Sequence, residues 1–242
     1  MPTEVAPGIH RLGNELVNFY LVEGEGGLTL VDAAVPTFRD QLEVLLREQR
    51  RTLASVDAVA LTHAHPDHVG VAEAVRAAGA TVYVHEADAE MARTTKTPKR
   101  ERSLLPYVRY RAAWRTAAVL ARAGRPVKIA EVTPFSGDEP LDIPGRPRPI
   151  HTPGHSHGHV AYHFADRGVL MVGDALCTRN PLTGRPGPQV MPAALAVSSA
   201  AEMEALANLE GIEAGLLLPG HGDPWTGGVD AAIARARELG PS

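Results

Sequence analysis

The segment THAHPDH, residues 62–68, places four potential metal ligands within six positions: His63, His65, Asp67 and His68. Because a single residue separates the first two histidines, an extended backbone directs both imidazoles to the same side, where their nitrogens can meet at one cation. Pro66 then bends the chain and displaces Asp67 and His68 to another direction. The sequence therefore predicts two metal ions side by side.

Asp67 has a second interpretation that the residues alone leave open. Residues 69–78 have the composition of a helix, and aspartate is a preferred residue at the position that caps a helix N-terminus. Asp67 is therefore expected either to bind a metal or to cap this helix. Three histidines within six positions have no comparable structural explanation.

Further polar groups follow apolar, strand-like stretches later in the chain. They occur in HTPGHSHGH (residues 151–159), in VGD (residues 172–174) and in LPGHG (residues 218–222). Loops at strand ends are where open sheets collect their functional sites. Glycine and proline beside the histidines permit the tight turns that such loops need.

In this order, the motifs resemble those of the metallo-β-lactamase fold superfamily over nearly the whole chain. The family has an early aspartate at a strand end, here Asp32 in LVDAA, then an HxHxDH loop, a GH histidine, a GD aspartate and a late histidine. The resemblance implies a first metal held by His63, His65 and His155. It implies a second metal held by Asp67, His68 and His221, with Asp174 bridging both. Asp32 would steady the metal loop.

Comparison with the separate branches of this superfamily excludes some of the activities that the resemblance implies. The true β-lactamases usually carry Cys or Ser where this chain has Asp174, and flavodiiron proteins carry Glu where it has His65 and add a flavin domain. RNA-processing nucleases add a large second domain or an arm. The remaining resemblance is to glyoxalase II, thioesterases, lactonases and related small hydrolases. Typical glyoxalase II grips glutathione with a C-terminal helical domain, whereas here the chain ends about twenty residues after His221, which argues against specificity for glutathione thioesters.

Composition limits the class of protein. A length of 242 residues with 44% hydrophobic residues suits one domain, residues 1–242, with a substantial core. The net charge of −4 gives no general attraction to nucleic acid. Neither a leader peptide nor a long apolar run is present, so we expect a cytoplasmic protein without membrane contact. Cys177 is the single cysteine, so the metal ligands must be nitrogen and oxygen.

Hydrophobic periodicity predicts two halves, and each half has strands first and helices later in the sequence. In the first half we expect strands at residues 8–12, 19–23, 28–32, 57–61 and 81–85 and helices at 36–50 and 69–78. In the second half we expect strands near residues 141, 150, 160, 170 and 215–218 and helices at 199–209 and 229–239. This pattern indicates an α+β fold, a four-layer αβ/βα sandwich of two mixed β-sheets flanked by helices.

Residues 91–128, between the halves, form a basic insert. They hold eleven of the 24 basic residues and one acid, Glu101, so the local charge is about 11 − 1 = +10. Residues 104–123 favour a helix with Tyr107, Tyr110 and Trp114 along one stripe. One interpretation is a flap packed on the body or on the partner in a homodimer. The other is a lid whose aromatic residues contact an apolar acyl group while arginines hold a carboxylate or phosphate. Membrane-surface or nucleic-acid binding is disfavoured by the low aromatic content.

The remaining histidines and the cysteine receive mostly structural interpretations. His159 is expected to be a hydrogen-bonded core residue, whereas His157 is predicted to face the substrate, together with the three aromatic residues of the insert. Structural roles are also expected for a group at strand ends: His10, His85, His151 and His163. Cys177 is expected to be a small buried apolar residue.

The predicted chemistry follows from two divalent cations. A hydroxide that bridges them is available near neutral pH and would attack a carbonyl carbon of a small-molecule ester, thioester or lactone. Asp67 would orient this nucleophile and carry a proton. Zinc suits the nitrogen-rich site, although iron or manganese also suits it. The main alternative is an oxidoreductase similar to the persulfide dioxygenases, with one iron at His63, His155 and Asp174. A metal-bound scaffold without turnover is a third class.

Overall fold

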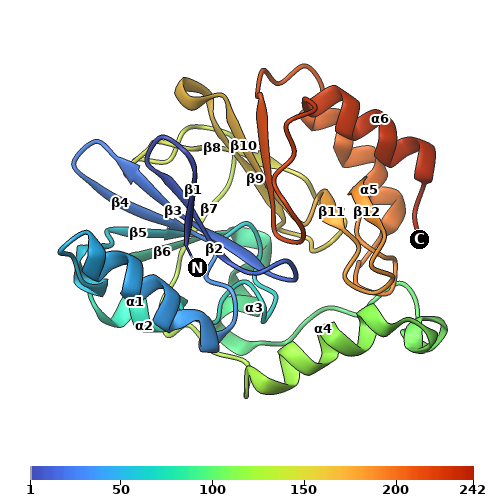
Figure 1. Ribbon diagram of the computed structural model, residues 1–242, viewed down its shortest axis with the longest axis horizontal. Coiled ribbons are helices and arrows are strands. Elements are labelled where there is room, and N and C mark those ends of the chain that lie inside the picture. Colours follow the sequence, from blue (N-terminus) through green and yellow to red (C-terminus); the bar gives the residue numbers. More distant parts are fainter. Residues whose placement is uncertain (1) are drawn as a thin grey trace.

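The computed structural model describes residues 2–242, which form two β-sheets packed against each other with helices on both outer sides (Figure 1). The first sheet has seven strands in the order β1 (Thr3–Ala6), β2 (Ile9–Gly13), β3 (Asn18–Gly24), β4 (Gly27–Val31), β5 (Ala58–Ala60), β6 (Thr81–His85) and β7 (Thr133–Phe135). Its strands are antiparallel from β1 to β4 and parallel from β4 to β7. The sheet is therefore mixed, as predicted.

The second sheet has four strands in the order β13 (Leu216–Pro219), β10 (Val169–Gly173), β9 (Val160–Phe164) and β8 (Arg148–His151). Only β10 and β13 are parallel. A further antiparallel pair consists of β11 (Cys177–Arg179) and β12 (Pro186–Gln189).

Helices cover the outer faces of these sheets. The first sheet carries α1 (Arg39–Glu48), α2 (Ala72–Ala77) and α3 (Ala89–Thr94), and the second carries α5 (Ser199–Ala205) and α6 (Val229–Leu239) (Figure 1). The helix α4 (Arg111–Arg122) lies apart from them, below both halves. Short 3-10 helices are η1 (Pro36–Phe38), η2 (Leu53–Ser55), η3 (Glu86–Asp88), η4 (Leu105–Arg109), η5 (Ala165–Arg167) and η6 (Leu206–Leu209). None of the helices within residues 2–242 combines the length and apolar character needed to cross a bilayer.

Side-chain alternation along the strands produces three hydrophobic layers. In β3, Phe19 and Leu21 face the helices, whereas Tyr20 and Val22 face the second sheet. In β10, Leu170 packs toward α5 and α6 and Met171 packs between the sheets. Because successive strand residues point to opposite faces, each sheet buries both of its sides. The predicted four-layer sandwich is confirmed.

The strand predicted near Leu141 and the helix predicted at residues 104–123 differ from the structure. The strand expected near Leu141 is absent, and Leu141 instead lies in the loop between β7 and β8, where its backbone N–H donates to the Pro147 carbonyl. The seventh strand of the first sheet is β7, which contains Pro134. An edge strand tolerates proline because one side of its backbone needs no ladder partner. Leu141 packs against the hydrophobic core between the sheets, and this burial was mistaken for the sign of a strand.

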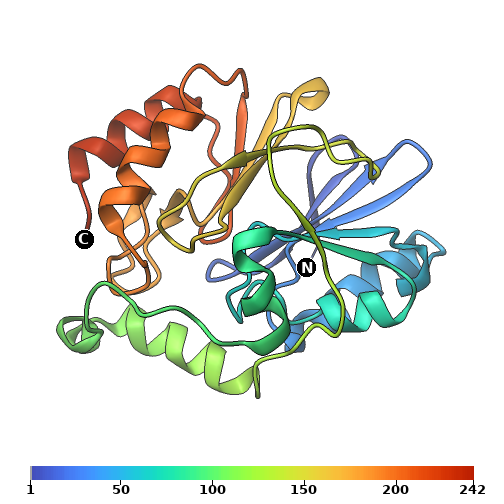
Figure 2. The ribbon, with the colours of Figure 1, turned by 180° about the vertical axis from the view of Figure 1, so that it is seen from behind.

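The helix predicted at residues 104–123 is interrupted. The 3-10 helix η4 begins at Leu105 with Pro106 in its first turn, and Tyr110 then has an extended backbone (φ −96°, ψ 130°) before α4 starts. The break separates the aromatic residues of the expected stripe: Tyr107 is buried, whereas Trp114 is 64% exposed. The segment after α4 returns upward behind the sheets to β7 (Figure 2).

Candidate metal centre

Five loops that follow strand ends meet between the two sheets. Asp32 follows β4, the segment THAHPDH follows β5, and His155 lies in the loop after β8. Asp174 follows β10 and His221 follows β13. Loops at the same end of the two sheets can bring residues that are distant in sequence to one point, and this arrangement does so.

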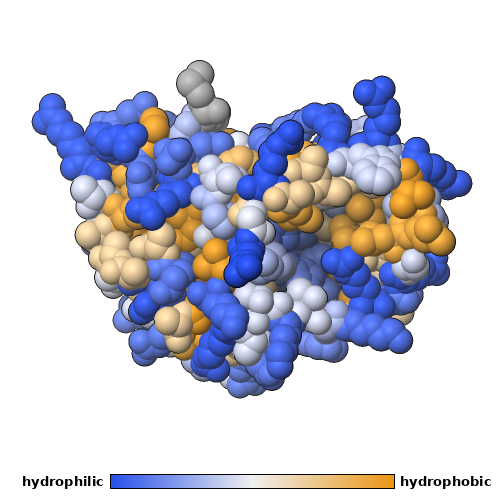
Figure 3. All heavy atoms as spheres, turned by 90° about the horizontal axis from the view of Figure 1, so that it is seen from below, coloured by the Kyte–Doolittle hydropathy of each residue, from blue (hydrophilic) through white to orange (hydrophobic). Residues whose placement is uncertain are grey.

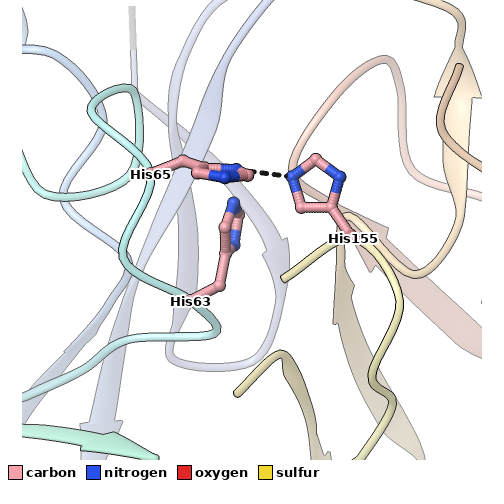
Figure 4. A group of neighbouring side chains, drawn as sticks. All are labelled: His63, His65 and His155. Atoms are coloured by element: carbon pink, nitrogen blue, oxygen red, sulfur yellow. Dashed lines mark hydrogen bonds between the residues drawn. The ribbon is translucent and has the colours of Figure 1, made fainter. Parts of the chain in front are cut away.

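His63, His65 and His155 form the first group, with their potential ligand atoms all within 4.8 Å of one another. Figure 4 shows the three rings converging from two separate pieces of chain. His65 Nδ1 lies 2.8 Å from His155 Nε2, and the His63 ring meets the other two at 88° and 84°. Three nitrogens that face one point from nearly perpendicular rings are suited to a common cation.

Asp67, His68 and His221 form the second group. The carboxylate oxygen Asp67 Oδ2 lies 3.7 Å from His221 Nε2 and 4.0 Å from His68 Nε2. Such spacings are near the about 3.3 Å that separates two ligands in a tetrahedron with bonds of about 2 Å to zinc.

Asp174 lies between the two groups. Its Oδ2 is 3.3 Å from His155 Nε2 and 3.1 Å from His221 Nε2, and its Oδ1 is 3.5 Å from His68 Nε2. One carboxylate therefore faces ligands of both groups. The structure brings together all seven residues for which the sequence implied metal binding.

The buried polar atoms of this cluster fit a cation. His63 Nε2, His68 Nε2 and Asp174 Oδ1 are buried, and none has a hydrogen-bond partner among the described residues. Unpaired buried polar atoms are costly, and a bound cation would satisfy all three. Five imidazoles and two carboxylates without a thiolate suit zinc and other divalent transition metals.

The electrostatic field of the cluster favours positive charge at His68 and His221, whose pKa values are raised, whereas burial lowers the pKa of His63, His65 and His155. Burial alone lowers the pKa of His68, but Asp174 and Asp32 outweigh it and raise that pKa to about 10. The same carboxylates that hold a proton on this imidazole would hold a metal ion near it.

Asp32 holds the loop of residues 62–68, which carries four of the candidate ligands, in place through hydrogen bonds. Its carboxylate accepts hydrogen bonds from the Thr62 backbone N–H at 2.8 Å and from His68 Nδ1 at 2.9 Å. The Thr62 hydroxyl also bonds to Asp32 and lies 3.0 Å from His63 Nδ1. Asp32 has a left-handed backbone (φ 58°), which aspartate tolerates better than most residues. These contacts are the ones expected of a residue that fixes the loop.

The two interpretations of Asp67 are now distinguished. Helix α2 begins at Ala72, with Val71 at its capping position and no side-chain cap. Asp67 instead points toward His221 and lines a cleft beside it. The cap was the wrong interpretation, because the turn after Pro66 delays the start of the helix.

His159 is a structural residue, as predicted. It is fully buried, its Nε2 accepts from the Asp174 backbone N–H at 2.9 Å, and its Nδ1 lies 2.8 Å from the Thr152 hydroxyl. Burial lowers its pKa to about 3, which keeps the ring neutral. His159 thereby fixes the backbone of Asp174.

Asp88, at the end of η3, was missed by the sequence analysis. It is buried, and its carboxylate accepts from the Ser156 hydroxyl at 2.6 Å, from the Gly158 N–H at 2.8 Å and from the Ala64 N–H at 3.2 Å. It therefore ties the loop of His63 and His65 to the loop of His155. Its position just after strand β6 was the available signal.

A cleft of about 270 Å³ opens over the metal ligands. The basic insert forms one wall of it through Thr95, Arg100, Thr116 and Leu120. Thr116 also donates to the Pro181 carbonyl at 2.6 Å, and Val119 packs against the core of the first half, so α4 is held by both halves. Figure 3, viewed from the side of α4, shows the surface hollowed.

The four predicted substrate contacts lie outside this cleft. Tyr107 and Trp114 line a second, apolar pocket of about 190 Å³, and Tyr110 lines neither pocket. His157 is exposed, and its backbone oxygen lies 2.9 Å from His151 Nε2. The two pockets share four lining residues: Arg100, Thr116, Leu120 and Leu195. The aromatic residues of the insert are thus adjacent to the cleft without contacting the metal ligands.

Comparison with known proteins identifies the family of this chain. The sequence profile described as "Metallo-beta-lactamase superfamily" matches residues 12–221. A probable metallo-hydrolase, YflN, of Bacillus subtilis is 26% identical, with 93% of this chain and 87% of that protein covered. A hydroxyacylglutathione hydrolase of Gloeobacter violaceus is 28% identical over 69% of this chain and 52% of that protein.

Solved structures share the same architecture. A metallo-beta-lactamase family protein of Thermus thermophilus is 27% identical and superposes with a TM-score of 0.70, covering 98% of this chain and 79% of the other. A B3 metallo-beta-lactamase with an active-site glutamic acid superposes equally well, with a TM-score of 0.70 at 18% identity, over 98% of this chain and 88% of that one. The second likeness concerns the fold alone.

Proposed function

Since this chain belongs to the metallo-beta-lactamase superfamily, we propose that it is a binuclear metal-dependent hydrolase that cleaves an ester, thioester or lactone. The observation that carries this proposal is the second ligand group, Asp67, His68 and His221, which lies beside the first and shares Asp174 with it. A site for one metal would not need these three further ligands to converge.

Two divalent cations held by these ligands would supply a nucleophile, by lowering the pKa of water, and would polarise a carbonyl group. The protein's own part is to orient the reactants. Asp67 has 19% of its side chain exposed and lines the cleft, so it can both contact a cation and reach a water molecule there. We assign Asp67 the role of holding that water and accepting its proton.

The cleft supports an acyl substrate with an apolar portion. The reacting carbonyl would lie over Asp67 and His155, and the apolar portion would extend past Leu120 and Leu195 toward the pocket with Tyr107 and Trp114. Arg100 lines both pockets and can bind a carboxylate or phosphate at the junction. In this proposal the basic insert acts as a wall and lid.

Thioesters are the first substrates to test. The Gloeobacter violaceus relative is named for hydrolysis of a glutathione derivative, and it matches 69% of this chain. A panel of acyl thioesters, p-nitrophenyl esters and lactones would be assayed with zinc-loaded protein, while the metal content of protein purified without added metal is measured by mass spectrometry.

The expected result is about two equivalents of zinc, or of another divalent metal, together with hydrolysis of at least one class of the panel. One equivalent of iron, with oxygen uptake on a persulfide, would instead identify the oxidoreductase alternative. Two bound metals without turnover of any ester, thioester or lactone would contradict the proposed reaction.

A further inference from the structure

Four histidines of the metal centre direct Nε2 toward the cluster, which leaves Nδ1 on the outer side. Three of these outer nitrogens have partners: His63 Nδ1 lies 3.0 Å from the Thr62 hydroxyl, His68 Nδ1 lies 2.9 Å from Asp32, and His221 Nδ1 contacts the Leu16 carbonyl. His155 is the exception, because its Nδ1 is buried without a hydrogen-bond partner among the described residues.

A carboxylate faces this unpaired nitrogen. Glu202 Oε1 lies 3.7 Å from His155 Nδ1, and the two side chains are 1% and 3% exposed. Neither oxygen of Glu202 has a hydrogen-bond partner in residues 2–242. A buried carboxylate with no partner costs stability, so its position needs a compensating interaction.

The backbone holds Glu202 and His155 together. Helix α5 begins at Ser199, and the N–H groups of Val197 and Ser198 just before it both donate to the Gly154 carbonyl at 2.9 Å. A Cβ at Gly154 would lie 2.3 Å from the Glu202 backbone nitrogen, so only glycine permits this approach. The loop of His155 is therefore docked on the first turn of α5, with the carboxylate directed at the ring.

We propose that Glu202 is a positioning residue for the metal centre, which accepts a hydrogen bond from His155 Nδ1–H when Nε2 binds a cation. The proposal rests on metal binding by the cluster and not on the reaction catalysed. A movement of less than about 1 Å would convert the present 3.7 Å separation into an ordinary hydrogen bond. The contact fixes the tautomer that leaves Nε2 free and increases the basicity of the ring.

The test compares Glu202→Gln with Glu204→Gln, which changes an exposed residue of the same helix. Zinc affinity of metal-stripped protein is measured by competition with a chromophoric chelator at fixed pH. We expect Glu202→Gln to weaken binding by about 10- to 100-fold, the usual effect of losing an outer hydrogen-bond partner of a metal ligand. Glu204→Gln should bind as the wild type does.

Thermal unfolding supplies a readout that a merely structural role would not move in this way. Without metal, Glu202→Gln should melt at the same temperature as the wild type or higher, since it replaces a buried carboxyl group that has no hydrogen-bond partner among the described residues. With zinc, its gain in melting temperature should be smaller than that of the wild type. The spectrum of the cobalt-loaded variant should also differ from that of the wild type.

Wild-type zinc affinity in Glu202→Gln would overturn the proposal, as would a lower melting temperature of the metal-free variant with unchanged affinity. If Glu202→Gln does not fold, Glu202→Asp retains the charge but is too short to reach the ring, and the same loss of affinity is expected. If the wild type itself binds no metal, the proposed function fails as well. Metal binding without hydrolysis leaves this inference standing alone.

Discussion

The metal centre and the basic insert, residues 91–128, both line one cleft, yet they are built in different ways. Five of the seven candidate ligands are buried, and His65 and Asp67 are half-buried; the loops that carry them are held by hydrogen bonds such as that between Asp32 and His68. The insert is mostly exposed and is attached through a few contacts, such as that between Thr116 and Pro181. We infer that the buried centre supplies the chemistry and that the lightly attached insert influences the choice of substrate.

Metal removal should give the largest effect if the centre is organised around cations. A chelator should abolish hydrolysis and lower the melting temperature. A metal present at 100 times its Kd stabilises by about 2.7 kcal/mol, which corresponds to about 5–10 °C in a chain of this size. Calorimetry with and without zinc measures this shift. An unchanged melting temperature after complete stripping would show that the unpaired atoms of His63 and His68 do not require a cation.

The variant His63→Ala should produce the next largest loss. His63 is fully buried, and its Nε2 faces the cluster without a partner among the described residues. Since loss of an outer partner of a ligand costs up to about 100-fold, loss of the ligand itself should lower kcat/KM by more than about 100-fold. His151→Ala, at an exposed histidine, is the matched control. The idea fails if His63→Ala retains both zinc and activity at wild-type levels.

Asp32→Asn tests how rigidly the centre is held. Asparagine tolerates the left-handed backbone as aspartate does, so the change removes charge and acceptor capacity without adding backbone strain. We expect zinc affinity to fall by about 10- to 100-fold and stability to fall by about 2 kcal/mol, because hydrogen bonds to a charged group are lost. Chelator competition and denaturant unfolding measure the two quantities. Asp166→Asn, at an exposed aspartate, should change neither of them.

Most residues of the candidate metal centre could be predicted from the sequence because the patterns that indicate them are local. The spacing of His63 and His65 reflects the two-residue period of an extended chain, and the later ligands follow apolar strands directly. Asp88 and Glu202 escaped notice because each acts on residues far away in the chain, Ser156 and His155 respectively. The position of Asp88 just after β6 was its one local signal, and neither acid has a neighbour in the sequence that identifies its partner.

The insert was harder to interpret because its shape depends on tertiary contacts. Helical periodicity was correct within α4 but ran across Pro106 and Tyr110, where the backbone leaves the helix. One extended residue was enough to direct Tyr107 inward and to leave Trp114 exposed. A stripe deduced from spacing holds only while the helix is continuous, so Tyr107 and Trp114 line the adjacent pocket and Tyr110 lines neither.

Leu120→Ala should give the smallest loss of activity and should distinguish the role of the insert from that of the metal centre most clearly. Leu120 lines both pockets but is 40% exposed, so its loss should cost about 1 kcal/mol of contact with an apolar acyl chain. We expect kcat/KM to fall about fivefold for long acyl substrates and to stay near the wild-type value for acetyl substrates. Zinc affinity and melting temperature should stay near those of the wild type.

The matched control for Leu120→Ala is Leu105→Ala, at a leucine that is 73% exposed and lines neither pocket. If both variants lower kcat/KM equally, the insert affects activity only through its packing on the rest of the protein, and Leu120 makes no specific contact with the substrate. If Leu120→Ala affects acetyl and long acyl substrates alike, the side chain supports the metal centre and not the acyl chain. A loss that grows with chain length and occurs only in Leu120→Ala assigns substrate choice to the insert, because the metal centre is unchanged in that variant.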